Sequence, residues 1–134
     1  MNTCVLDTDV VIAALDQSDA HHRAAAAAFA RFEAERVELL MCSINYAEAL
    51  VRPAQDERSL RAATEAINAL GVRIEAPDAS VARLAATHRN LGISLADGFA
   101  LATAERTRAD VASFDKRVRR AVDLAGLPLS QQLT

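Results

Sequence analysis

Short apolar runs alternate with longer amphipathic segments along the whole chain. The short runs have the length of buried strands, and we expect strands at 3–7, 37–42, 72–76 and 110–114, with a short fifth strand at 127–130. The segments between them have the apolar spacing of helices, which we expect at 9–15, 19–36, 43–52, 55–69, 77–91, 95–108 and 116–125. Strands that are separated by helices pair in parallel. The sequence therefore predicts an α/β fold, a three-layer α/β/α sandwich with a central parallel sheet of 4–5 strands.

Proline, glycine and capping residues mark the ends of several expected helices. Pro53 ends one helix, and Gly71 and Gly92 end two later ones. Either Thr8 or Asp9 is the expected N-cap of the first helix. Because no linker, repeat or low-complexity stretch interrupts the pattern, we expect one continuous domain.

The composition is that of an ordinary globular domain, but its charge is uneven. The chain has 134 residues, 51% of them hydrophobic, which suits a single domain over 1–134. A formal net charge of −3 excludes a generally basic nucleic-acid binder. Basic residues nevertheless concentrate within 106–120, at Arg106, Arg108, Lys116, Arg117, Arg119 and Arg120. This stretch is either a solvated surface or a contact for phosphates.

Cysteine usage and the N-terminal sequence predict the compartment. Cys4 and Cys42 both lie in expected strands and lack the CxxC spacing, so we expect them to be buried and reduced. The N-terminus leads directly into a strand, and no window approaches the roughly 18 uninterrupted apolar residues of a membrane span. We therefore expect a cytoplasmic protein with no membrane association.

Four acidic residues fall near the expected carboxyl edge of the sheet. Asp7 ends the first strand, and Asp115 follows the fourth. Glu48 lies in the second turn of the helix after the second strand, and Asp97 lies in the first turn of the helix that Ser94 caps. Because the functional sites of parallel sheets lie at this edge, we expect the four acids to meet in one cleft.

Such a cluster needs a cation. Two carboxylates about 4 Å apart repel each other by roughly 4 kcal/mol at an effective dielectric constant near 20. Without a cation, the cluster is destabilising or some of its members hold a proton. Mg²⁺ prefers oxygen ligands, and it can activate water and neutralise charge on a phosphodiester. The four acids therefore predict a metal site suited to phosphodiester hydrolysis.

Four motifs, in order along the chain, carry a family resemblance. These are VLDTDVVIAAL, SINYAEAL, ISLADGFALATA and VASFDKRV. Together they resemble the motifs of PIN-domain ribonucleases, and with this length the chain resembles the VapC-type toxins of type II toxin–antitoxin systems. The resemblance covers about residues 3–130.

The resemblance implies a PIN-like fold and a Mg²⁺- or Mn²⁺-dependent endoribonuclease that leaves a 5′-phosphate and a 3′-hydroxyl. It implies a VapB-like antitoxin as the partner protein, RNA as the substrate, and a homodimer. Carried over by motif, Asp7 and Asp97 are the direct metal ligands, and Glu48 and Asp115 complete the pocket directly or through water. Ser113 matches the small hydroxyl residue that precedes the last acid by two positions.

The sequence departs from the family pattern at two positions. Asp9 stands where the family often has Ser, Thr or Asn, so it either adds a carboxylate to the site or caps a helix. Gly98 stands where the family usually has Ala, and we expect it to give the cleft room.

Structural roles compete with the functional ones. Helix capping is the preferred role of Asp9, and Asp97 and Asp115 could also serve only as helix caps. His21 and His22 are expected to be surface residues, because no third zinc ligand lies near them in the sequence. The alanine run 24–28 serves either internal packing or an interface with a second copy or an antitoxin.

Two alternative functions stay open at this point. One is a PIN-like module that binds RNA or protein without cutting, although all four acid positions are filled. The other is a haloacid-dehalogenase-like phosphatase, with Asp7 as nucleophile and Asp9 as general acid. Against this second alternative, Lys116, the single lysine, follows Asp97 instead of preceding the late acidic motif.

Overall fold

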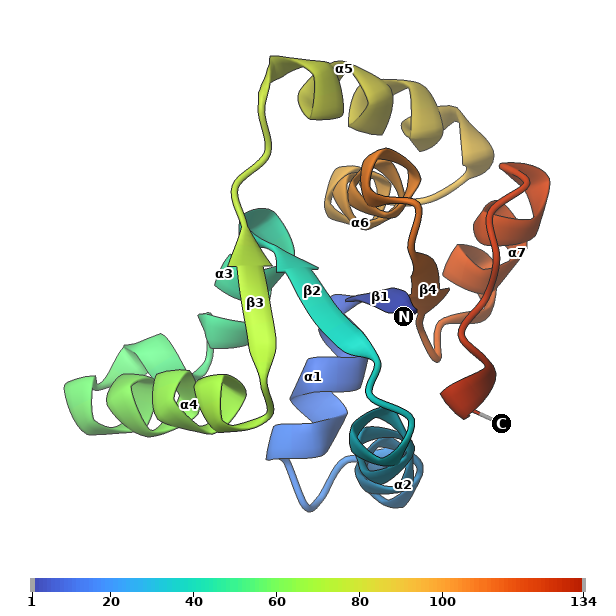
Figure 1. Ribbon diagram of the computed structural model, residues 1–134. Helices are drawn as coiled ribbons and strands as arrows, with labels where there is room; N and C mark the ends of the chain where they lie inside the picture. The colour runs from blue at the N-terminus through green and yellow to red at the C-terminus, as the bar shows by residue number, and fades with distance from the viewer. Residues whose placement is uncertain (1, 134) are drawn as a thin grey trace.

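A parallel sheet forms the centre of the molecule, as the computed structural model shows for residues 2–133 (Figure 1). Its strands are β1 (Thr3–Leu6), β2 (Glu38–Cys42), β3 (Val72–Glu75) and β4 (Asp110–Ala112). They run in the order β3-β2-β1-β4, and every neighbouring pair is parallel. The predicted α/β class with a central parallel sheet is confirmed.

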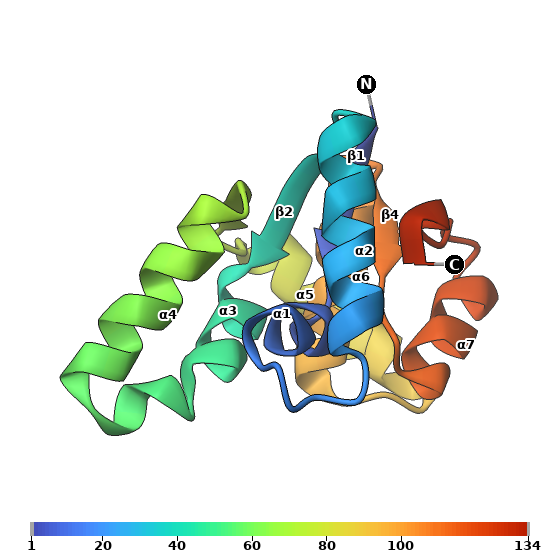
Figure 2. The ribbon, with the colours of Figure 1, turned by 90° about the horizontal axis from the view of Figure 1, so that it is seen from below.

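Helices follow each strand and cover the sheet. The α-helices are α1 (Thr8–Leu15), α2 (His22–Ala34), α3 (Ser43–Leu50), α4 (Glu57–Ala69), α5 (Ala79–His88), α6 (Leu95–Thr107) and α7 (Lys116–Leu124). Three short 3-10 helices are η1 (Pro53–Gln55), η2 (Arg89–Leu91) and η3 (Gln131–Leu133). Figure 2 shows α4 at one edge of the molecule and α7 at the opposite edge.

The two faces of the sheet belong to two separate apolar cores. Along β1, Cys4 and Leu6 point into the core formed with α1, α2, α3 and α4. Val5, between them, points into the other core, formed with α6 and α7. This is the alternation expected of successive strand residues, and it explains why the central strand is apolar throughout.

The expected fifth strand at 127–130 is wrong. This segment forms only an isolated bridge between Leu129 and Val111. Val111 N donates to Pro128 O (2.9 Å), and Ser130 N donates to Val111 O (2.8 Å). Pro128 has no N–H to donate, so the segment cannot extend these two bonds into a regular ladder.

Several helix bounds differ from the expected ones. The expected helix 19–36 is shorter at both ends, and the expected helix 55–69 begins at Glu57, where the Asp56 side chain accepts from Ser59 N (2.8 Å). The expected helix 77–91 ends at His88, and the 3-10 turn η2 fills the rest as far as Gly92. Local capping chemistry therefore decides these ends, and the apolar spacing alone does not locate them.

Both cysteines, Cys4 and Cys42, are buried and unpaired, as expected. Burial raises the pKa of the Cys4 thiol to about 12. None of the helices in residues 2–133 combines the length and the apolar character that crossing a bilayer requires.

The expectation that Gly98 gives the cleft room is wrong. Gly98 instead lets α5 and α6 approach each other closely. A Cβ atom at this position would lie 2.6 Å from the carbonyl oxygen of Ala85, which belongs to the backbone of α5. Real Cβ atoms essentially never come so close, and a backbone carbonyl cannot turn away as a flexible side chain can.

Gly98→Ala should therefore destabilise the protein, although alanine is the better helix former by about 1 kcal/mol. Separating α5 from α6 costs about 1–3 kcal/mol, as other overpacked sites do, so we expect a net loss of unfolding free energy in urea. Leu95→Ala, at a half-exposed position of the same helix, serves as the control. An alanine variant as stable as the parent would show that α5 moves freely.

Candidate active site

Asp7 lies at the carboxyl end of the central strand and is almost completely buried. Its side chain is 2% exposed. Oδ1 accepts a hydrogen bond from Thr8 N (2.9 Å), and Oδ2 accepts one from Ser113 Oγ (2.7 Å). Asp7 is therefore the N-cap of α1, and the expectation that Thr8 or Asp9 caps this helix is wrong, because the helix begins one residue earlier.

Ser113 connects Asp7 to Asp115. The buried Ser113 Oγ donates to Asp7 and accepts from Asp115 N (3.1 Å). The Asp115 carboxylate caps α7 through Oδ1, which accepts from Arg117 N (2.8 Å) and Val118 N (3.4 Å). The capping role weighed for Asp115 is thus present, and its Oδ2 takes no part in the cap.

Asp9 links α1 to the loop between β4 and α7 and does not cap a helix. It stands in the first turn of α1, and its Oδ2 accepts from Phe114 N (3.0 Å) in the loop between β4 and α7. Its Oδ1 is buried and has no hydrogen-bond partner among the residues that the structure describes. The preferred prediction of helix capping for Asp9 is therefore wrong.

Asp97 reaches the same region from α6. Ser94 Oγ accepts from Asp97 N (3.1 Å), and Asp97 Oδ2 accepts from Ser94 N (3.3 Å), which makes a reciprocal capping box. Asp97 and Asp115 line one pocket of about 370 Å³. The charge of Asp97 also raises the pKa of Asp7, so the capping role does not keep this carboxylate away from the cluster.

Glu48 is exposed, yet its position is fixed by a hydroxyl group. Thr8 Oγ1 donates to Glu48 Oε1 (2.7 Å) and lies 3.3 Å from the carbonyl oxygen of Asn45. Thr8 directly follows Asp7 in the chain. The structure therefore brings Glu48 to the same end of the sheet as Asp7, at the rim and not in the buried part.

Sequence reasoning missed Thr8 and Asn45 as supports of the site. Asn45 is completely buried on α3, and its Nδ2 donates to the carbonyl of Ala96 (3.0 Å), next to Asp97. Its Oδ1 has no partner within residues 2–133. The available signal was the spacing, because Asn45 stands three positions before Glu48 on the same helix face.

His21 is exposed, as expected, whereas His22 is partly buried, and both make contacts. The ring of the exposed His21 stacks on Phe114, with centroids 4.5 Å apart and planes 5° apart. His22 Nδ1 lies 2.7 Å from the carbonyl oxygen of Ala13. His21 also lies close enough to Asp9 for its charge to lower the pKa of that carboxyl.

Burial dominates the electrostatics of the cluster. Burial, together with the charges of Asp9 and Asp97 and against the Ser113 hydrogen bond, raises the pKa of Asp7 to about 7. Burial also raises the pKa of Asp9 to about 6, helped by the charge of Asp115 and opposed by the Phe114 N–H. Both acids are therefore held in an environment that disfavours their charged forms.

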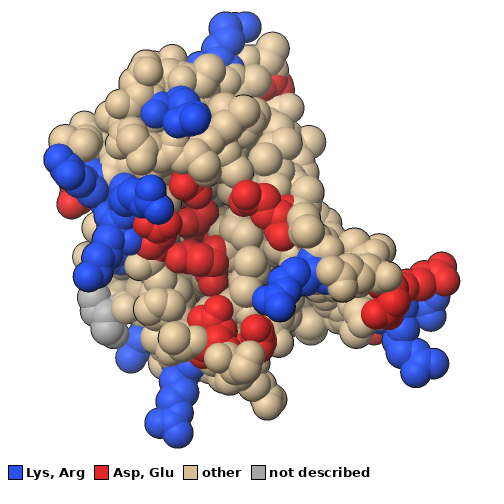
Figure 3. Space-filling model, turned by 180° about the vertical axis from the view of Figure 1, so that it is seen from behind, with Lys and Arg blue, Asp and Glu red and all other residues tan. Residues whose placement is uncertain are grey.

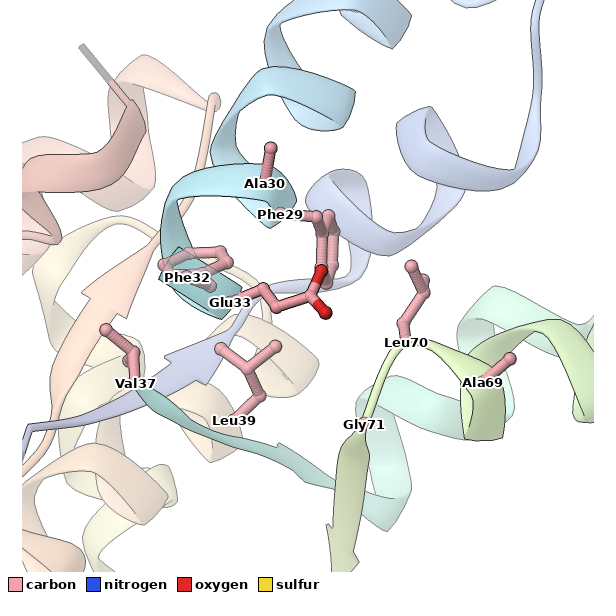
Figure 4. Close-up of a pocket in the computed structure, with 9 residues that line it drawn as sticks. All are labelled: Phe29, Ala30, Phe32, Glu33, Val37, Leu39, Ala69, Leu70 and Gly71. Atoms are coloured by element: carbon pink, nitrogen blue, oxygen red, sulfur yellow. The ribbon is translucent and has the colours of Figure 1, made fainter. Parts of the chain in front are cut away.

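Acidic residues gather in a hollow on one face of the molecule, and basic residues lie directly beside it (Figure 3). A larger pocket, of about 500 Å³, lies elsewhere, between α2, β2 and the end of α4 (Figure 4). Its lining is mostly apolar, with Glu33 as its acidic residue and none of the predicted site acids. Since its chemistry offers no reactive group, the acidic hollow is the candidate active site.

The donor set suits a hard divalent cation such as Mg²⁺ or Mn²⁺, which prefers oxygen ligands. The unpartnered, buried Asp9 Oδ1 and the crowding of charge around Asp7 both fit such an ion. Within residues 2–133, however, no three His, Cys, Asp or Glu side chains are placed to hold one ion together. The arrangement therefore fits an ion held by one or two carboxylates with waters, which is common for Mg²⁺.

Fold and site together define a parallel α/β domain with a carboxylate-rich hollow at the carboxyl edge of its sheet. Residues 4–124 match the family model of the PIN domain. The chain therefore belongs to the PIN-domain family, and the phosphatase alternative is wrong. No curated protein matches the sequence significantly.

Solved structures of bacterial proteins share this fold at low sequence identity. FitAcB from Neisseria gonorrhoeae has a TM-score of 0.67 at 23% identity, over 96% of this chain and 97% of that one. VapC20 from Mycobacterium tuberculosis, described as a toxin that cleaves the sarcin–ricin loop, has a TM-score of 0.70 at 19% identity, over 92% and 95%. VapBC-1 from nontypeable Haemophilus influenzae has a TM-score of 0.71 at 17% identity, over 98% and 99%.

The raised pKa values predict that the metal-free protein loses stability as the pH rises. Asp7 and Asp9 have pKa values of about 7 and about 6 in the folded chain, against an ordinary value of 3.8, so the folded state binds their protons more tightly. Their contribution is complete below pH 3.8 and is lost as the pH rises through 6 and 7.

In EDTA, the free energy of unfolding in urea should fall between about pH 5 and about pH 8, by on the order of a few kcal/mol. Asp7→Asn should flatten most of this dependence, because the amide does not ionise. A parent protein whose stability rises over that interval would contradict the burial of Asp7 as a proton-binding group.

Proposed function

We propose that this protein is a Mg²⁺- or Mn²⁺-dependent endoribonuclease that acts as the toxin of a toxin–antitoxin pair, with 1–134 as a single PIN domain. The observation that carries the proposal is the approach of acids from three separate segments, the start of α1, α6 and the start of α7, to one edge of the sheet. The charges of Asp9 and Asp97 both raise the pKa of Asp7, and Ser113 connects Asp7 to Asp115. Membership of the PIN family supports the nuclease class.

Asp7 and Asp97 are the proposed direct ligands of the ion, and Glu48 and Asp115 complete the pocket directly or through water. When bound, the ion would act as a Lewis acid. It would lower the pKa of a water bound to it and neutralise charge on a phosphodiester. Asp9 adds a fifth carboxylate, whose buried Oδ1 has no partner in the described chain.

The residues of the chain orient these acids before any ligand arrives. Ser113 Oγ and Thr8 N hold both oxygens of Asp7, so its carboxylate has one orientation. Thr8 Oγ1 holds Glu48 at the rim. Such preorganised groups need little rearrangement when RNA binds, and hydrolysis then leaves a 5′-phosphate and a 3′-hydroxyl.

The solved structures with this fold support a partner protein. Among them are VapBC2 from Rickettsia felis bound to a promoter DNA fragment, and a toxin–antitoxin complex from Klebsiella pneumoniae. We therefore propose a VapB-like antitoxin as the partner of this chain and RNA in the cytoplasm as its substrate. Homodimer formation is part of the same proposal.

Asp7→Asn and Asp97→Asn should each abolish metal-dependent cleavage of total RNA. Because either change removes charge repulsion, the variants should fold as stably as the parent or more stably in EDTA. Asp123→Asn, at an exposed position of α7, is the matched control and should cut at the parent rate. Full cleavage by Asp7→Asn, measured on gels with added Mg²⁺ or Mn²⁺, would refute the assignment of the site.

Induced expression of the parent chain should arrest bacterial growth, and Asp7→Asn should not. Co-expression of the adjacent reading frame should restore growth if that frame encodes the antitoxin.

A PIN module that binds RNA without cutting it is the second candidate function, because no three His, Cys, Asp or Glu side chains within residues 2–133 are placed to share an ion. RNA binding without metal-dependent cleavage would favour that second candidate.

A further inference from the structure

We propose that Arg117 and Arg89 form a phosphate-binding subsite for the RNA backbone, beside the acids and next to the phosphate that is cut. The inference rests on the proposed ribonuclease function and adds a substrate-positioning site to it. It starts from the pocket of about 370 Å³ that Asp97 and Asp115 share. That volume lies within the range of about 300–1,000 Å³ typical of small-molecule sites.

The pocket combines acidic and basic side chains from three elements. Arg89, from η2, and Asp97, from the first turn of α6, line one part of it. Asp115 and Arg117, from the start of α7, line another.

Arg117 is the cation of this pocket that the protein leaves unused. Its backbone N–H donates to Asp115, but its side chain has no hydrogen bond or ion pair with any described residue. It lines the same pocket as two carboxylates and pairs with neither. A guanidinium group offers five N–H donors, so the unpartnered one can receive an anion at low cost.

Arg89 is held in place and still has donors to offer. Its Nη1 donates to the carbonyl oxygen of Ile93 (3.1 Å), which orients the guanidinium at the pocket. The remaining N–H groups have no hydrogen-bond partner within residues 2–133, and a planar guanidinium matches the oxygens of a phosphate. Two arginines on different segments can thus contact one phosphate group.

Arg117 is the basic residue of the 106–120 stretch that lines this pocket, and Arg89 lies outside the stretch. Arg119 donates to the Ser113 carbonyl (3.0 Å), and Arg106 donates to Ser80 Oγ (2.7 Å). Arg108, Lys116 and Arg120 are exposed and do not line the pocket. The expected phosphate contact of this stretch therefore narrows to Arg117, with Arg89 added from outside it.

The charge balance of the hollow favours a nucleic-acid strand over an acidic peptide. The acids repel every anion, so a ligand must bring one anionic group to the ion at the acids and a second one to the arginines. A nucleic-acid strand has such groups at every residue of its backbone, and each one is a phosphate that arginine binds well. The subsite would then hold the strand in register for cutting.

The test uses protein carrying Asp7→Asn, so that bound RNA is not cut. Its affinity for a single-stranded RNA oligonucleotide is measured as a function of NaCl concentration. Adding Arg117→Gln should reduce the slope of log K against log salt by about 0.7, the value for one lost contact with a single strand, and should weaken binding about fivefold at ~0.1 M salt. Arg120→Gln is the matched control and should change both much less.

Neutral phosphates in the RNA locate the contact. One methylphosphonate, moved along the oligonucleotide, should weaken binding to the Asp7→Asn protein at one position and leave binding to the Asp7→Asn, Arg117→Gln protein unchanged at that position. In the catalytically intact chain, Arg117→Gln should raise KM and change kcat little, as expected for uniform binding. Thermal unfolding of the two glutamine variants confirms that both are folded.

Each result decides a separate claim. Equal loss of RNA binding in the Arg117 and Arg120 variants would overturn the subsite and leave the proposed ribonuclease intact. Weaker binding of poly-glutamate by Arg117→Gln, with RNA binding unchanged, would also overturn the subsite and indicate an acidic protein partner. No RNA binding by the Asp7→Asn protein would overturn both the subsite and the proposed function.

Discussion

Repulsion between carboxylates, held close together by the protein itself, is the constraint on which the rest of this structure depends. Asp7 is buried, and its pKa is raised first by that burial and then by its neighbours Asp9 and Asp97. A fold can keep such a group only if its oxygens are satisfied, and Ser113 and the Thr8 N–H do this. The sheet, the capped helices and the buried serine together keep these carboxylates close to one another despite their mutual repulsion.

The same side chains that create the acidic hollow also begin the helices around it. Asp7 caps α1, Asp115 caps α7, and Asp97 completes the capping box of α6. Each cap uses one of the two carboxylate oxygens, and in Asp7 the second oxygen accepts from Ser113. The positive ends of three helices also face the acids and partly offset their mutual repulsion.

The fold and the acid positions could be predicted from the sequence because both depend on local pattern. Alternating apolar runs determine the parallel sheet, and its carboxyl edge follows from the connections between strands. The failures depend on contacts between distant segments. Asp9 was expected to cap a helix, but it binds Phe114 N, and Gly98 was expected to widen the cleft, but it admits the Ala85 carbonyl. Thr8 and Asn45 were missed for the same reason, since their partners lie on other elements.

The hydrogen bond between Ser113 and Asp7 joins residues 106 positions apart. A ribosome must therefore synthesise nearly the whole chain before this contact can form, because β4 and the loop after it are the last parts of the site to emerge. An incomplete nascent chain has Asp7 without its serine and without Asp115. The acidic cluster is therefore completed only when the polypeptide is almost finished.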